Sequence, residues 1–200
     1  KALELFQQAA SKGSASACVA LATAYRYGMF KLPKDDKMFL KYAQLAWNQK
    51  EYYAGGLMAD YYFQNNEYKK GWKYLNEAVK WGDVPSKMLS VQSYFYGVNG
   101  VKEDEQKAIR MMTEIVSSIQ YEQTLQYAGV FLMQARDTAL VDTAKALEYW
   151  LMGAERKYGS CCLYLAEHYI IVQDYEKAYE YAMLAQQYDD SDETGGHACR

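Results

Sequence analysis

The stretch from Tyr175 to Ala185, YEKAYEYAMLA, indicates how the whole chain is built, because the chain contains it more than once. The same arrangement occurs earlier in the sequence, at Tyr68, Lys70, Gly71, Leu75 and Ala78. Weaker copies are marked by a Lys-Ala pair, or by its replacement, at positions 1–2, 38–39, 107–108 and 145–146. Successive copies therefore follow one another with a period of about 30–40 residues, and a period of this length predicts a helical-repeat solenoid.

The composition agrees with a folded chain made largely of helices. Hydrophobic residues make up 50% of the sequence and charged residues 24%, which is an ordinary balance for a globular protein. Only two prolines, Pro33 and Pro85, interrupt the sequence, so long stretches are free to be helical. The 21 tyrosines are unusual. Because tyrosine has an apolar ring and a polar tip, it suits half-buried helix faces and binding surfaces.

Charge and hydropathy exclude two classes of protein. The net charge of −3 provides no basic excess with which to displace counterions from a nucleic acid. No part of the sequence approaches the roughly 18 uncharged apolar residues of a membrane-spanning helix. We therefore predict neither a nucleic-acid partner nor a membrane span.

The four cysteines are Cys18, Cys161, Cys162 and Cys199, and they form no Cys-x-x-Cys pair. Free thiols on small, buried helix residues are the expected state, since a stretched solenoid keeps its two ends apart. Free thiols favour a cytoplasmic location. The chain begins at Lys1, inside a predicted helix, so we expect it to be part of a longer protein. A signal peptide outside this sequence would make the protein periplasmic or secreted, and the compartment stays open.

Apolar residues at helical spacing predict eleven helices joined by short connections, so neighbouring helices are expected to be antiparallel. They cover residues 1–12, 15–27, 36–49, 52–64, 67–81, 85–96, 104–118, 121–136, 142–157, 160–172 and 174–188. Asn66 is expected to cap the helix that begins at residue 67. We expect an all-α, right-handed α-α superhelix over residues 1–188, with an incomplete first repeat. The acidic residues 189–200 lack apolar periodicity and are expected to form a disordered tail.

Several segments resemble Sel-one-like repeats (SLR), a family of paired-helix repeats. The similar segments are Tyr25–Gly28, Tyr94–Gly97 and Asp142–Trp150. The two shortest repeats resemble tetratricopeptide repeats more closely, with Ala59, Tyr62, Tyr68, Leu75 and Ala78 on the matching positions and Ala166, Tyr169, Tyr175, Ala178 and Ala185 in the second copy. Two places depart from the pattern. Met38-Phe39 replaces Lys-Ala, and residues 115–118 lack the small residues and glycine that let helices pack closely.

The resemblance implies a function in which the first helix of each pair lines a concave groove that binds a protein or peptide. Counting from the small or apolar residue inside each first helix, the groove is expected to contain Thr23, Arg26, Tyr27, Asp60, Phe63, Gln64, Gln92, Phe95, Tyr96, Val130, Met133, Gln134, Glu167, Ile170 and Ile171. Aromatics and amides among few charges are typical of a binding surface. The alternative is that the aromatic members pack against adjoining helices, because apolar residues at helical spacing usually belong to the core.

Other candidate sites are weaker, and we predict no catalytic, cofactor or metal site. His168 has no His or Cys partner at the i+4 position, so a structural or surface role is expected. His197 and Cys199 would form a poor metal site in a mobile tail. The acidic run 189–193 lacks the spacing of a calcium loop, and the loop 97–100 lacks the context of a phosphate loop.

Three functions are therefore compared. The first is a non-enzymatic scaffold that binds a protein or peptide in its groove. The second is a spacer or assembly arm with possible end-to-end self-association, because the last predicted helix has no successor to cover it. The third, a regulatory domain attached to an enzyme, has the least support, since no Gly-x-Ser-x-Gly elbow or nucleophile–base pair is present.

Overall fold

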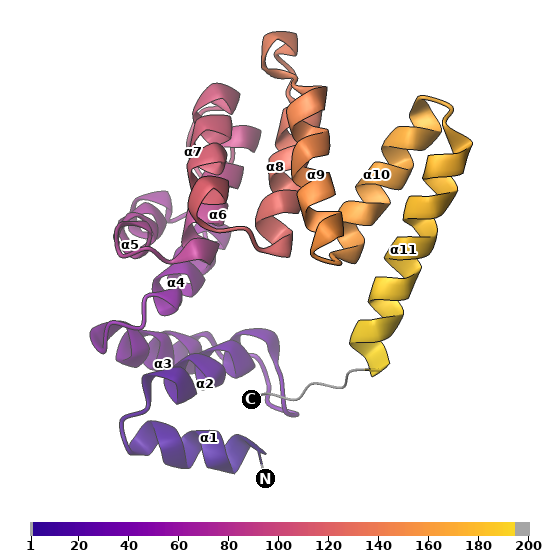
Figure 1. Cartoon of the computed structure of the whole chain (residues 1–200). Helices are drawn as coiled ribbons and strands as arrows, with labels where there is room; N and C mark the ends of the chain where they lie inside the picture. Colours follow the sequence, from indigo (N-terminus) through magenta and orange to yellow (C-terminus); the bar gives the residue numbers. More distant parts are fainter. Residues whose placement is uncertain (1, 195–200) are drawn as a thin grey trace. The chain divides into compact units, whose positions relative to one another are not determined.

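The computed structural model describes the backbone of residues 2–194 and the side chains as far as residue 188. This part of the chain holds eleven α-helices, one short 3₁₀-helix and no strand, which confirms the predicted all-α class (Figure 1). The α-helices are α1 (Ala2–Ser11), α2 (Ala15–Tyr27), α3 (Asp36–Asn48), α4 (Tyr53–Gln64), α5 (Tyr68–Lys80), α6 (Val84–Tyr96), α7 (Glu105–Ser118), α8 (Glu122–Gln134), α9 (Thr143–Glu155), α10 (Gly159–Ile171) and α11 (Tyr175–Thr194).

The predicted helix positions agree closely with the observed ones, and two differences occur. A 3₁₀-helix, η1 (Thr138–Leu140), lies in the connection between α8 and α9, where no regular structure was expected. The last helix, α11, continues to Thr194, past its predicted end at residue 188. Residues 195–200, where the expected tail ends and where His197 and Cys199 lie, are outside the described residues. Within residues 2–194, no helix combines the length and apolar character needed to cross a bilayer.

Aspartates and glycines set the ends of many helices. Asp35, Asp83, Asp104 and Asp142 each accept a hydrogen bond from a backbone N–H in the first turn of the helix that follows. Gly28 and Gly97 end α2 and α6 in the left-handed conformation that a side chain disfavours. Asn66, expected to cap α5, instead takes a left-handed φ of 58°, and Glu67 holds the cap position. The prediction for Asn66 was therefore wrong.

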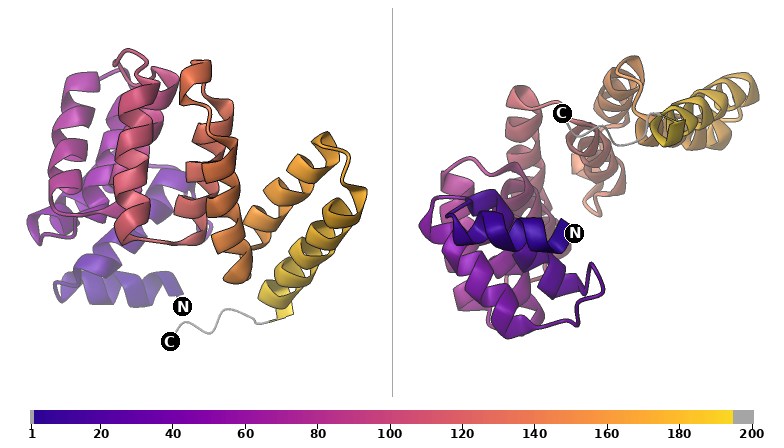
Figure 2. Two further views of the ribbon diagram at one scale, coloured as in Figure 1. Left: turned by 45° about the horizontal axis from the view of Figure 1, so that its top comes forward. Right: turned by 90° about the horizontal axis from the view of Figure 1, so that it is seen from below.

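The chain divides into two compact units, Lys1–Glu103 and Asp104–Arg200. In the first unit, α2, α3, α4 and α5 pack successively, and α6 lies against both α4 and α5. In the second unit, α7 to α11 pack successively, and α8 also contacts α10. Both views in Figure 2 show α10 and α11 as an antiparallel pair. Each unit thus has the neighbour-on-neighbour packing of helical repeats.

Small residues let the helices of the first unit approach one another. Ala46, Ala54, Ala59 and Ala78 are completely buried, as the repeat pattern predicts. Phe39, from the pair that replaces Lys-Ala, is also completely buried and packs with Ala22, Ala43 and Met58. Tyrosines surround this cluster and stack pairwise, for example Tyr25 on Tyr42 with ring centroids 5.9 Å apart. Many of the unusual tyrosines are therefore structural.

The second unit departs from the repeat pattern at its start. The repeat pattern has small residues where Ile115 and Val116 are found. Both side chains are buried, at 5% and 2% exposure, so larger residues occupy these core positions. The carboxylate of Glu105, at the start of α7, is buried too. It accepts hydrogen bonds from the backbone N–H groups of Arg136 (2.9 and 3.0 Å) and Asp137 (3.1 Å). This contact fixes the chain after α8 to the beginning of α7.

Helices α2–α5 and α8–α11 are two copies of one four-helix arrangement, in the register set by the repeated stretch of sequence. The shift in numbering that carries Tyr68 onto Tyr175 also carries α2 onto α8 and α3 onto α9, end to end. Left-handed residues recur under the same shift, Lys50 with Lys157 and Asn66 with Gln173. The Tyr62–Tyr74 stack (5.7 Å, 6°) recurs as Tyr169–Tyr181 (5.6 Å, 5°). Side chains in the two copies can therefore be compared position by position.

Candidate functional site

In the first copy, three predicted groove residues, Arg26, Asp60 and Gln64, meet in one network. The Arg26 guanidinium donates a hydrogen bond to Gln64 Oε1 and lies 3.8 Å from an Asp60 carboxylate oxygen. Gln64 Nε2 donates in turn to Asp60 Oδ2 at 2.8 Å. Asp36, on α3, lies 3.9 Å from the same guanidinium. The guanidinium of Arg26 is therefore bound by other side chains of the same chain.

Two aromatic rings complete the surroundings of Arg26. Its guanidinium carbon lies 5.0 Å from the ring centroid of Tyr61 and 5.5 Å from that of Phe39, which is within the range of cation–π attraction. Only 13% of the Arg26 side chain is exposed. This cation, surrounded by rings and carboxylates, fills the space between α2, α3 and α4.

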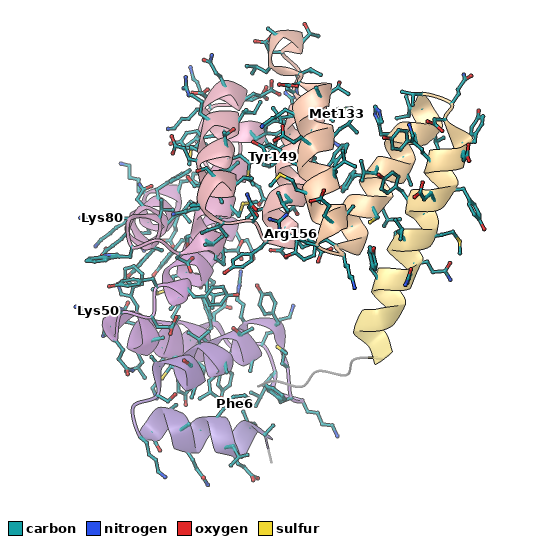
Figure 3. The ribbon with its side chains drawn as sticks, in the orientation of Figure 1. Phe6, Lys50, Lys80, Met133, Tyr149 and Arg156 are labelled. Atoms are coloured by element: carbon teal, nitrogen blue, oxygen red, sulfur yellow. The ribbon has the colours of Figure 1, made fainter. Side chains whose placement is uncertain are left out.

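In the second copy, the corresponding place is a cavity of about 240 Å³ between α8, α9 and α10 (Met133 is labelled in Figure 3). We call it the α8–α10 pocket. Its lining is Val130, Met133, Gln134, Trp150, Tyr164, Glu167, His168 and Ile171. Five of these eight are predicted groove residues, so the structure brings together the residues that the repeat pattern assigned to two successive first helices. Trp150, Tyr164 and His168 were not predicted.

The walls of the α8–α10 pocket are aromatic and fixed, and its rim is polar. The Trp150 ring stacks on Tyr164 with centroids 5.1 Å apart, and its Nε1 donates to the Gln126 carbonyl oxygen at 3.2 Å. Glu167 and Gln134 are exposed at the rim. Among the described residues, Glu167 makes no hydrogen bond or ion pair. The pocket therefore offers a free carboxylate beside aromatic surface.

The other predicted groove residues differ in how far they are exposed to solvent. Phe63 and Phe95 are buried at 5% and 3% exposure, so the alternative interpretation, packing against neighbouring helices, applies to both. Phe63 packs on Trp72 with ring centroids 5.6 Å apart. Thr23 and Gln92 are half-buried, while Tyr27, Tyr96 and Ile170 are exposed at 53%, 44% and 56%.

Trp150, Tyr164 and His168 were not predicted, because the sequence analysis assigned only certain positions of each first helix to the groove. Trp150 comes from a second helix, and those positions lie on first helices alone. Tyr164 and His168 lie on α10, where His168 was judged only as a metal ligand or catalyst. A comparison with the first copy would have found His168, because its equivalent there is Tyr61, which lies beside Arg26.

The cysteines of the described region lie in the core. Cys18, Cys161 and Cys162 are buried thiols, as predicted. Burial raises the pKa of the Cys161 thiol to about 12, so it is protonated at neutral pH and a poor nucleophile. No group of three or more His, Cys, Asp or Glu side chains within this region is placed to hold a metal ion. The arrangement of the pocket is suited to binding.

These features define the class of fold: an all-α array of helical repeats with a cavity of about 240 Å³ between the successive first helices α8 and α10. No protein-family model and no curated protein sequence matches the chain. Solved structures match its fold at 18% sequence identity. One is c5321, a protective antigen present in uropathogenic Escherichia coli strains that displays an SLR fold, with a TM-score of 0.65.

The match to c5321 covers 92% of this chain and 41% of that chain, so this chain spans less than half of that protein's length. The second is a Sel1 repeat protein from Oxalobacter formigenes, with a TM-score of 0.68, where the match covers 92% of this chain and 84% of that chain. Both neighbours confirm the expected SLR-like fold.

Proposed function

We propose that this chain is a non-enzymatic interaction scaffold that binds a segment of another protein at the α8–α10 pocket. The observation that carries the proposal is the convergence of Val130, Met133 and Gln134 on α8 with Glu167 and Ile171 on α10 around one cavity. These residues come from successive first helices, the elements that line binding surfaces in helical-repeat proteins.

The size and chemistry of the pocket suit one side chain of a polypeptide. Sites for drug-sized ligands have volumes of about 300–1,000 Å³, whereas this cavity measures about 240 Å³. It combines apolar and aromatic walls with a few polar groups at the rim, which is the usual composition of a recognition pocket. Ile171 is 75% exposed beside it, so neighbouring residues of a bound segment have an apolar surface to contact.

The test is selection of binders from a random peptide library, followed by affinity measurements on variants of the pocket rim. The double variant Gln134→Ala/Ile171→Ala removes two exposed side chains and leaves the core intact, so it should fold normally and bind the selected peptides at least about tenfold more weakly. Its matched control is Tyr27→Ala/Gln64→Ala, the same two positions in the first copy. Equal affinity of wild type and the rim variant for every selected peptide would contradict the proposal.

A second candidate function, an assembly arm, is favoured by exposed apolar residues on α10 and α11. Ile170, Tyr179 and Met183 are exposed at 56%, 69% and 48%. Sedimentation velocity at rising concentration tests this function. If the chain associates with itself and Tyr179→Glu abolishes the association, the assembly function is supported. A chain that stays monomeric at all concentrations would argue against it.

A further inference from the structure

Met133 occupies in the second copy the position that Arg26 occupies in the first. Two of the five groups that contact Arg26 have a chemically similar counterpart, whereas Asp36, Phe39 and Gln64 are replaced by Thr143, Ala146 and Ile171. Glu167 takes the place of Asp60, and His168 takes the place of Tyr61. The second copy therefore has a carboxylate and an aromatic ring at equivalent positions, with an uncharged methionine in place of the cationic arginine.

The guanidinium of Arg26 shows what this arrangement holds when it is filled. It contacts the Asp60 carboxylate, the Gln64 amide oxygen and two aromatic rings at once. In the second copy, the Met133 side chain carries no charge and the lining of the pocket contains no Lys or Arg. The cavity of about 240 Å³ is left beside Glu167, whose carboxylate has no partner among the described residues.

From this correspondence we propose that the α8–α10 pocket binds an arginine side chain of the partner segment, in the way that Arg26 is bound within the first copy. This inference rests on the proposed function, since it specifies the side chain that the pocket receives. The guanidinium stacks on the aromatic surface of Trp150, Tyr164 and His168, and it donates hydrogen bonds to Glu167.

The chemistry of the pocket favours arginine over other side chains. Carboxylate and amide oxygens at the rim are acceptors, and guanidinium offers five N–H donors and no acceptor. Its flat face stacks on aromatic rings, whereas a lysine ammonium is a compact, strongly hydrated charge. An aliphatic side chain would fill the cavity and leave Glu167 without a partner. An acidic one would be repelled by Glu167.

The charge of the pocket lining also favours a cation. Glu167 is its only acidic residue, and the lining contains no Lys or Arg. On the neighbouring helix α11, the cation Lys177 is engaged in an ion pair with Asp174 at 3.1 Å.

The experiment uses the full chain labelled with ¹⁵N and three synthetic peptides of sequence acetyl-Gly-Tyr-Xaa-Tyr-Gly-amide. Xaa is arginine, lysine or citrulline, the neutral analogue of arginine. We expect the arginine peptide to shift the Trp150 Nε1–H resonance in a saturable manner. The citrulline peptide should bind about tenfold more weakly, and the lysine peptide between the two.

Two substitutions assign the effect to the pocket. Met133→Arg recreates the filled state of the first copy, so the folded variant should no longer respond to the arginine peptide. Glu167→Gln should reduce the preference for arginine over citrulline without removing the pocket. Met133→Leu, which keeps the cavity apolar and uncharged, is the matched control and should respond like wild type. Circular dichroism confirms that each variant is folded.

Equal shifts with arginine and citrulline, or no shift with any of the three peptides, would overturn the arginine inference. The proposed function would survive that result if library selection still yields peptides sensitive to Gln134→Ala/Ile171→Ala. If the selected peptides lack arginine, the pocket binds another side chain and this inference fails alone. If no selected peptide responds to the rim variant, the proposed function itself fails.

Discussion

Helices α2–α5 and α8–α11 have the same helix order and a left-handed residue at two equivalent connecting positions, 50/157 and 66/173, yet they differ in what fills their interior. In the first copy, the Arg26 side chain occupies the space between α2 and α4 and is 13% exposed. In the second copy, Met133 leaves a cavity there. The comparison shows that a few side-chain changes at equivalent positions, here Met133 for Arg26 together with Ala146 for Phe39, accompany the change from a structural contact to a candidate binding pocket.

Core contacts in the two copies show compensating changes of size. The completely buried pair Ala46 and Ala54 of the first copy corresponds to Gly153 and Cys161 of the second. A Cβ added to Gly153 would lie 2.6 Å from the Cys161 Cβ and closer still to its sulfur. Likewise, Gly71, where an added Cβ would meet the Phe63 ring, corresponds to Ala178, and Phe63 corresponds to the smaller Ile170. In both pairs one residue is larger and the other smaller than its equivalent, as close packing requires.

The largest expected effect concerns equivalent faces of α5 and α11. Leu75 is completely buried and packs with Ala59 and Phe63, so Leu75→Ala should lower the free energy of unfolding by about 2–5 kcal/mol. The corresponding Ala182 is exposed, so Ala182→Leu should change it by less than about 0.5 kcal/mol. Urea denaturation followed by circular dichroism measures both. A comparable effect at the two positions would show that this face of α11 is as well covered as that of α5.

The second prediction uses the exchange of atoms between Gly153 and Cys161. Gly153→Ala alone should lower the free energy of unfolding by up to about 2 kcal/mol, because overpacking costs about 1–3 kcal/mol and better helix propensity returns about 1 kcal/mol. Adding Cys161→Ala recreates the Ala46–Ala54 pair and should recover most of the loss. A double-mutant cycle from denaturation curves measures the coupling. Simple additivity of the two changes would refute the idea of compensation.

The third prediction exchanges the residues that distinguish the two sites. Arg26→Met should lower the free energy of unfolding by about 1 kcal/mol, since it removes cation–π contacts and ion pairs that are partly exposed to water. Met133→Arg should leave it within about 0.5 kcal/mol of wild type, because the new guanidinium finds Glu167 and the aromatic walls. Thermal and urea unfolding check both variants. A strongly destabilised Met133→Arg would mean that the pocket cannot hold a guanidinium.

The smallest expected effect is a pH dependence at the start of α11. Hydrogen bonds from the Lys177 ammonium and its backbone N–H lower the pKa of Asp174 below its ordinary value. A carboxyl whose pKa is lowered by folding contributes stability above its unfolded pKa, and this contribution is lost as the pH falls through the folded pKa. NMR titration of the Asp174 carboxyl carbon should therefore show a midpoint below that of an unfolded peptide. Asp174→Asn should remove this acid sensitivity, and Lys177→Met should move the midpoint upward.

The fold was predictable because its signals are local and repeated. Helical periodicity placed all the helices of residues 2–194, and aspartate and glycine marked many of their ends. The misassigned features have weaker local signals. Asn66 has the composition of a cap, but it takes the left-handed connecting position that Gln173 fills in the other copy. The segment that leads into the 3₁₀-helix after α8 is held by the distant carboxylate of Glu105, a contact that sequence spacing does not reveal.

The candidate site was predictable only in part. Position rules identified Met133, Gln134 and Glu167, because one residue in each helical turn faces the same side of a helix. They also selected Phe63 and Phe95, which are buried, because sequence spacing does not distinguish a groove aromatic from a core aromatic. Trp150 was missed because it reaches the pocket from a second helix. Whether a cavity remains depends on the size of the side chain at residue 133, which only the three-dimensional arrangement shows.

The buried carboxylate of Glu105 sets a practical limit on how the second unit can be shortened. Its two oxygens are the acceptors for the backbone N–H groups of Arg136 and Asp137, next to the helix that supplies Met133 and Gln134. A fragment designed to begin after α7 would lose these acceptors and leave the segment after α8 unanchored. A minimal peptide-binding fragment for crystallisation or screening should therefore begin at or before Asp104, so that the cap of α7 and the Glu105 carboxylate are retained together.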